Sequence, residues 1–134
     1  MTYLPFHIFF MSAALLCMGV GIYIAHSHKS KKWWLKAHKI LNISAVVSAL
    51  VGLIMGDLMV EALGGPNLGL PHIWIGAVTL ILGFAMPILG FAIFKAKGKE
   101  KISGLKKWHR ILGRTTLAGL VVTIVSGLLT AGIL

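Results

Sequence analysis

Hydrophobic residues fall into four long segments that are separated by three short polar stretches. The segments cover about residues 4–26, 37–60, 71–94 and 108–133. Each is long enough to cross a bilayer as a helix, which takes about 20 apolar residues. We therefore predict an all-α membrane protein, with four transmembrane helices in an up-down bundle that forms one membrane domain over residues 1–134.

The polar stretches predict short connections rather than further domains. Gly64-Gly65-Pro66-Asn67, between the second and third segments, cannot continue a helix. The longest stretch, Lys95–Lys107, is too short to fold alone. Inside the third segment, Pro87 is expected to kink the helix.

Composition and charge give the protein an orientation in the membrane. The chain is 57% hydrophobic, which is far from the composition of a soluble domain. All thirteen Lys and Arg lie at the face shared by the first and third connections, whereas the opposite face carries only Asp57 and Glu61. The positive-inside rule then makes the basic face cytoplasmic and puts both termini outside. Because the charge follows topology, we expect no nucleic-acid partner, and we expect anionic lipid headgroups at the basic face.

Each segment has one histidine close to its start: His7, His38, His72 and His109. Successive helices reverse direction, so His7 and His72 start on one side of the membrane and His38 and His109 on the other. Helices 1 and 3 are diagonal neighbours in an up-down bundle, as are helices 2 and 4. The sequence therefore predicts two pairs of imidazoles across the bundle interior, one pair near each face.

Three interpretations of these histidines compete. A single histidine at a helix end often only reaches headgroups or a neighbouring helix, but ionisable residues inside a bilayer are costly and are usually functional. Zinc takes about four ligands at one point, which two distant pairs do not provide. Two imidazoles on opposite sides of a flat ring suit a bis-histidine haem, and we favour two such haems.

Small residues near the histidines would leave space for a flat macrocycle. Gly76 and Gly113 each lie four residues after a histidine, on the same helix face. Six other glycines are expected only to pack helices together: Gly52, Gly56, Gly83, Gly90, Gly119 and Gly127. His26 and His28 are expected to be solvated loop residues or to contact haem propionates.

The chain also contains a weak internal repeat. Leu4-Pro5-Phe6-His7-Ile8 is similar to Leu70-Pro71-His72-Ile73, and Lys36-Ala37-His38-Lys39-Ile40-Leu41 is similar to Lys107-Trp108-His109-Arg110-Ile111-Leu112. The histidine is at the centre of each match. Such a repeat suggests one duplicated helical hairpin.

Taken together, these features resemble the cytochrome b-561 family of transmembrane dihaem proteins. The resemblance rests on His72-Ile73-Trp74-Ile75-Gly76, on Trp108-His109-Arg110-Ile111-Leu112-Gly113 and on the basic run around His38. It implies two haems b, one held by His7 with His72 and one by His38 with His109, and electron transfer across the membrane. Eukaryotic members have two further flanking helices, so the four-helix pattern is expected of a minimal prokaryotic form in the cytoplasmic membrane.

The expected function is a membrane electron conduit between a cytoplasmic or membrane donor and an outer acceptor. Lys36, Lys39, Arg110 and Arg114 are expected to contact the propionates of the inner haem. The outer face has no basic residue, so a c-type cytochrome or a quinone fits there better than ascorbate. A transmembrane reductase activity and a homodimer both stay open, and no catalytic residue is predicted. The alternatives are a non-redox membrane anchor or scaffold and a metal or proton transporter.

The charge distribution predicts the topology. Cysteines introduced at Asn67 and at Lys99 should react with an impermeant thiol reagent from opposite sides of intact cells, with Asn67→Cys labelled from outside. Labelling of Lys99→Cys from outside would reverse the orientation.

Overall fold

The structure is a computed structural model that describes residues 2–64 and 71–134, and this part of the chain forms four α-helices. They are α1 (Leu4–Ser27), α2 (Trp34–Ala62), α3 (Pro71–Lys95) and α4 (Lys99–Thr130). All four are long and apolar enough to cross a membrane. The predicted all-α, four-helix membrane fold is confirmed. Most of the turn predicted over residues 64–67 lies outside the described residues.

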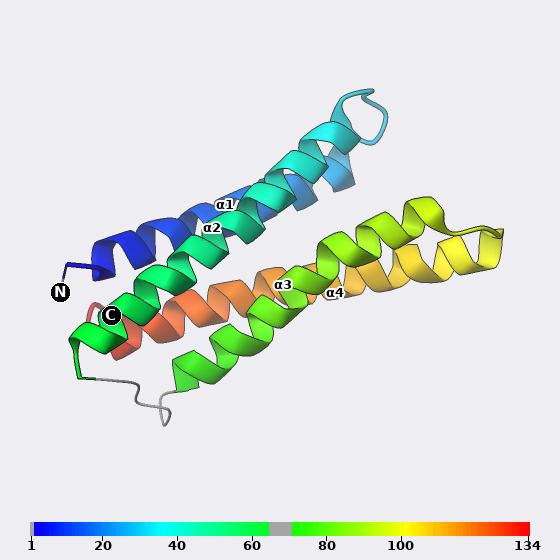
Figure 1. The fold of residues 1–134 in the computed structure, drawn as a ribbon. Coiled ribbons are helices and arrows are strands. Elements are labelled where there is room, and N and C mark those ends of the chain that lie inside the picture. The colour runs from blue at the N-terminus through cyan, green and yellow to red at the C-terminus, as the bar shows by residue number, and fades with distance from the viewer. Residues whose placement is uncertain (1, 65–70) are drawn as a thin grey trace.

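The helices are arranged as two hairpins (Figure 1). α1 packs on α2 along much of its length, and α3 packs on α4, whereas the contacts of α1 with α4 and of α2 with α3 are sparse. The diagonal helices, α1 with α3 and α2 with α4, do not pack on each other in the described part of the chain. This is the up-down order that places helices 1 and 3 across the bundle from each other.

The packing pattern is that of a protein surrounded by lipid. The most buried positions hold small side chains, with Ala14, Ala45 and Thr116 at most 2% exposed. Large aliphatic side chains point outward instead, and Ile88 is 70% exposed. Small interior residues let membrane helices approach closely, because the lipid already solvates the large apolar side chains.

α4 begins nine residues earlier than the hydrophobic pattern predicts. Gly98 has φ of +92°, a conformation that favours glycine, and ends the short turn after α3. The next residues, Lys99-Glu100-Lys101, are good helix formers, and Glu100 suits the positive end of a helix dipole. At about 1.5 Å per residue, the 32 residues of α4 span about 48 Å, more than the roughly 30 Å of a bilayer core. The basic stretch before residue 108 is therefore helical.

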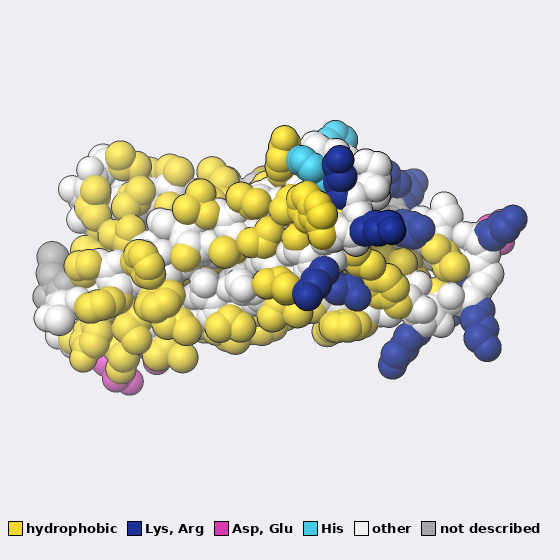
Figure 2. All heavy atoms as spheres, turned by 90° about the horizontal axis from the view of Figure 1, so that it is seen from above, with side chains coloured by type: hydrophobic (Ala, Val, Ile, Leu, Met, Phe, Trp, Pro, Cys, Tyr) yellow, Lys and Arg dark blue, Asp and Glu magenta, His cyan; other side chains and the backbone are white. Residues whose placement is uncertain are grey.

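Charged residues separate to the two ends of the bundle (Figure 2). Lysines and arginines gather around the α1–α2 and α3–α4 turns, and the acidic side chains at the opposite end are Asp57 and Glu61, both exposed. Both chain ends lie at this second end (Figure 1). The two basic connections thus share one face of the bundle, as the segment count predicts.

The close packing of α3 on α4 gives a stability prediction. A methyl group on Gly119 would lie 2.7 Å from the Thr79 hydroxyl, which is buried, whereas a methyl group on Gly19 meets nothing within 4 Å. Gly119→Ala should lower the unfolding free energy by about 1–3 kcal/mol through overpacking. The matched variant Gly19→Ala should leave it unchanged or raise it by up to about 1 kcal/mol. Thermal unfolding in detergent compares them, and equal stability would contradict this account of the interface.

Candidate functional site

The structure brings the four segment histidines together as two pairs. His7 on α1 faces His72 on α3, with ring centroids 6.1 Å apart and ring planes at 82°. His38 on α2 faces His109 on α4, with centroids 6.2 Å apart and planes at 74°. Each pair joins diagonal helices, so each takes one histidine from each hairpin. These are the pairs that the alternation of helix direction predicts.

Backbone carbonyl groups orient three of the four rings. His7 Nδ1 donates to the Gly52 carbonyl at 2.7 Å, His38 Nδ1 to the Gly21 carbonyl at 2.8 Å and His72 Nδ1 to the Thr123 carbonyl at 2.9 Å. A carbonyl oxygen only accepts hydrogen bonds, so the proton of each neutral ring is on Nδ1. Nε2 then carries the lone pair, which is the arrangement that prepares a histidine to bind a metal.

Glycines on the partner helix let the backbone approach these rings. A methyl group on Gly56 would lie 2.9 Å from His7 Nδ1, and one on Gly127 would lie 2.8 Å from His72 Cε1. At Gly21 the added group would overlap the side-chain amide of Asn42, which itself donates to the His38 carbonyl at 2.7 Å. Gly56 and Gly127, which the sequence predicted only to pack helices, therefore also form walls around the histidines.

A common helical spacing explains these contacts. Gly21 follows His7 by the same number of residues as Gly52 follows His38 and Thr123 follows His109. Gly56 and Gly127 follow His38 and His109 by about one further helical turn. With about 3.6 residues per turn, the two offsets are close to four and five full turns, so all five residues face the same side as the histidine. In an antiparallel hairpin, the end of one helix then meets the histidine at the start of its neighbour. This spacing is visible in the sequence, but it has meaning only once the hairpin register is known.

His109 departs from this pattern. One part of the pattern holds: Gly90 lies about five turns after His72 on α3, and a methyl group there would be 3.6 Å from His109 Cε1. Its Nδ1 atom, however, is buried and has no hydrogen-bond partner among the described residues. The residue about four turns after His72 is Met86, and Pro87 follows it directly.

The separation within each pair fits a metal bound between the two rings. A metal–imidazole bond is about 2.0–2.1 Å. A five-membered ring with bonds of about 1.3–1.4 Å puts its nitrogen atoms roughly 1.1–1.2 Å from the centroid. Two rings on opposite sides of one metal therefore have centroids about 6.2–6.6 Å apart, close to the 6.1 and 6.2 Å observed. Within residues 2–64 and 71–134, no three His, Cys, Asp or Glu side chains group around one metal position.

The two pairs lie at different depths of the bundle. His7 contacts Gly52 and Gly56 on α2, which follow His38 by about four and five helical turns. At about 5.4 Å per turn, the levels of the two pairs are roughly 21–27 Å apart along the helix axis. We call His7 and His72 the outer pair and His38 and His109 the inner pair, which is nearer the basic end.

The remaining predicted site residues occupy several environments. A methyl group added to Gly76 would lie 3.4 Å from Thr123 Cγ2, and one added to Gly113 would lie 3.7 Å from Met86 Sδ, both within the α3–α4 hairpin. Lys39 Nζ lies 4.2 Å from the centre of the Phe94 ring, a cation–π contact. Lys36, Arg110 and Arg114 are exposed, so the structure leaves their proposed contacts with propionates as predictions.

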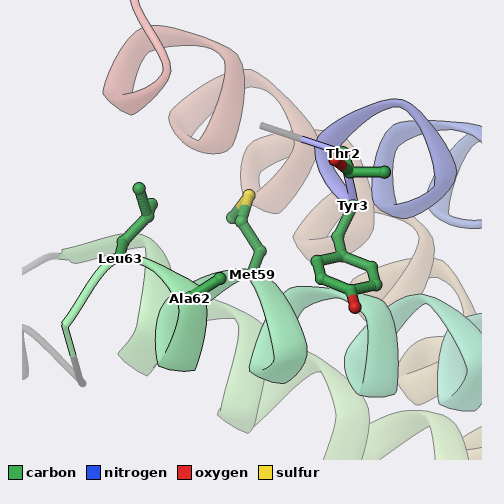
Figure 3. A pocket seen from close by; sticks show the side chains of 5 residues that line it. All are labelled: Thr2, Tyr3, Met59, Ala62 and Leu63. Carbon is green, nitrogen blue, oxygen red and sulfur yellow. The ribbon is translucent and has the colours of Figure 1, made fainter.

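Two hollows lie near the bundle ends. The outer one has a volume of about 90 Å³ and is lined by Thr2, Tyr3, Met59, Ala62 and Leu63 (Figure 3). At about 30 Å³ per water, it has room for a few water molecules. The other is an open groove of about 310 Å³ along the basic part of α4, lined by Lys99, Ile102, Ser103, Lys106 and Arg110. Its three cationic side chains suit an anionic group.

The loop histidines are separate from both pairs. His26 is exposed, and the His28 ring lies 5.5 Å from the Tyr23 ring and 5.6 Å from the Trp33 ring. His28 therefore belongs to an aromatic cluster at the α1–α2 connection.

Comparison with known proteins identifies a family. The sequence pattern of a family described as eukaryotic cytochrome b561 matches residues 4–134, which is nearly the whole chain. No curated protein and no solved structure gives a match. The matched region covers all four helices that carry the histidine pairs. The chain belongs to the cytochrome b561 family, whose members transfer electrons across membranes through haem b.

Proposed function

We propose that the protein holds two haems b and passes single electrons between the two membrane faces. The observation that carries this proposal is the pair of histidine–histidine separations, each close to the value for two imidazoles on one metal. His7 and His72 would be the ligands of an outer haem, and His38 and His109 those of an inner haem. Haem iron between two imidazoles supplies a one-electron couple that binds no substrate directly.

The chain's own groups prepare the ligands. The carbonyl groups of Gly21, Gly52 and Thr123 hold three imidazoles in one tautomer and restrict their rotation. This preorganisation lowers the cost of binding a flat ring and fixes which nitrogen faces the interior. The sparse packing between the hairpins supports a ring lying there, because in the described residues the diagonal helices approach each other through their histidine side chains and not through their backbones.

The two faces of the bundle favour different partners. The basic end, which includes the groove along α4, would face the cytoplasm and anionic lipid headgroups. The outer end has Asp57 and Glu61 exposed, so it favours a cationic redox protein such as a basic c-type cytochrome, or a neutral quinone from the bilayer. Electrons would pass from a cytoplasmic or membrane donor to the outer acceptor.

Loss of single ligands tests the two-haem proposal. A pyridine haemochrome assay on fully loaded protein should give two haems b per chain. His109→Ala should remove the inner haem alone and His72→Ala the outer haem alone, because the pairs lie roughly 21–27 Å apart. Redox titration should then show one midpoint in each variant.

The control for this experiment is His26→Ala, which removes an exposed histidine outside both pairs. It should keep two haems, and circular dichroism should show unchanged helix content in all three variants. Loss of both haems from folded His109→Ala or His72→Ala protein, or of neither, would contradict the assignment.

The acidic outer end predicts the charge preference of the acceptor. Reduced protein should be oxidised faster by a cationic acceptor than by an anionic one of similar potential, because opposite charges steer encounter. Stopped-flow measurements should show this gap narrowing as ionic strength rises. Neutralising the outer end with Asp57→Asn and Glu61→Gln should also narrow it.

The chain provides a matched control in Glu100, the acidic residue at the basic end of the bundle. Glu100→Gln removes one negative charge without changing the outer end, so the preference should persist when the acceptor is confined there. Equal oxidation rates with both acceptors at low salt would show that electrostatics does not determine which acceptor the outer end prefers.

A further inference from the structure

The structure distinguishes one histidine from the other three. His7, His38 and His72 each donate from Nδ1 to a backbone carbonyl, and in each case that carbonyl lies about four turns after the histidine of the neighbouring helix. His72 also has the Ser126 hydroxyl 3.3 Å from Nδ1. His109 Nδ1 is buried but has no partner in the described part of the chain.

The sequence of α3 gives a physical reason for this difference. The carbonyl that would complete the pattern belongs to Met86, and the next residue is a proline inside the helix. Proline disfavours helical geometry at the residue before it, so the orientation of the Met86 carbonyl is restricted even though α3 continues through it. The corresponding acceptors on the other helices, Gly21, Gly52 and Thr123, are followed by Ile22, Leu53 and Ile124, which impose no such restriction.

Hydrogen bonding at Nδ1 affects the metal through the ring. A bond from Nδ1–H to an acceptor makes the imidazole a stronger electron donor, and such outer partners are one of the means by which proteins tune haem iron. A stronger donor favours the ferric state and lowers the midpoint potential. A ligand without this bond does the opposite.

We propose that His109 is the tuning ligand of the chain: the Met86-Pro87 step withholds its hydrogen-bond acceptor and thereby raises the midpoint potential of the inner haem. This inference rests on the proposed two-haem function. It assigns to Met86 and Pro87 a positioning role that acts on the iron only through the orientation and basicity of His109.

The hairpin register identifies a site for restoring the bond. The two ends of the α3–α4 hairpin correspond, because Gly127 and Gly90 each face Cε1 of the opposing histidine. Ser126 directly precedes Gly127 and contacts Nδ1 of its opposing histidine, and the residue that directly precedes Gly90 is Leu89. A hydroxyl group at position 89 should therefore reach His109 Nδ1 in the same way.

The experiment is a redox titration of haem-loaded Leu89→Ser and Leu89→Thr protein. The inner midpoint should fall, with a two- to tenfold change in the ferric-to-ferrous ratio, or up to about 59 mV for one electron. The outer midpoint should not move. The inner midpoint is identified as the one that His109→Ala removes. Threonine retains more side-chain volume than serine and so protects against loss of packing.

The matched control is Ile88→Ser, which makes a similar substitution at the neighbouring, 70% exposed position. It should leave both midpoints in place. Two haems in every variant with an unmoved inner midpoint would overturn the inference while leaving the two-haem proposal intact. Loss of the inner haem from both Leu89 variants but not from Ile88→Ser would also overturn it, because position 89 would then serve packing alone. Fewer than two haems in the unmodified protein would instead contradict the proposed function.

Discussion

The hydrogen bond from a histidine Nδ1–H to a backbone carbonyl of the neighbouring helix is the interaction on which the rest of the bundle depends. Lipid offers no partner to a polar ring nitrogen, so the ring depends on acceptors in the protein, which His7, His38 and His72 have. In a helix nearly every carbonyl already accepts one hydrogen bond, so the ring needs very close access to donate a second one to the same oxygen. Glycine provides that access at positions 21, 52, 56 and 127, and thereby couples the packing of each hairpin to the orientation of its histidines.

Much of this architecture follows from the sequence alone. Four apolar segments give the spans, and the alternation of their direction sorts His7 with His72 and His38 with His109. Both conclusions depend only on segment length and order, which a bilayer constrains strongly. The basic residues likewise identify a common end for the two hairpin turns.

The details that were not foreseen depend on register between helices. Gly52 and Gly127 are ordinary packing glycines in sequence, and only the antiparallel alignment places them beside His7 and His72. The start of α4 is not visible in the hydrophobic pattern for another reason: a lysine-rich stretch has no apolar segment to indicate a membrane helix, although its helix propensity is good. His109 could not be distinguished from the other histidines, because the missing acceptor lies in the backbone of another helix.

The division of each histidine pair between hairpins has a consequence for biogenesis. α1 with α2, and α3 with α4, form closely packed units that a membrane can receive one after the other, but contacts between these units are sparse. A group bound between the two histidines of either pair would join the two hairpins. Because it binds only the joined state, it would stabilise that state by mass action. The abundance of assembled protein would then follow the cell's supply of haem. Chains made in haem shortage would remain as two loosely associated hairpins, open to membrane proteases.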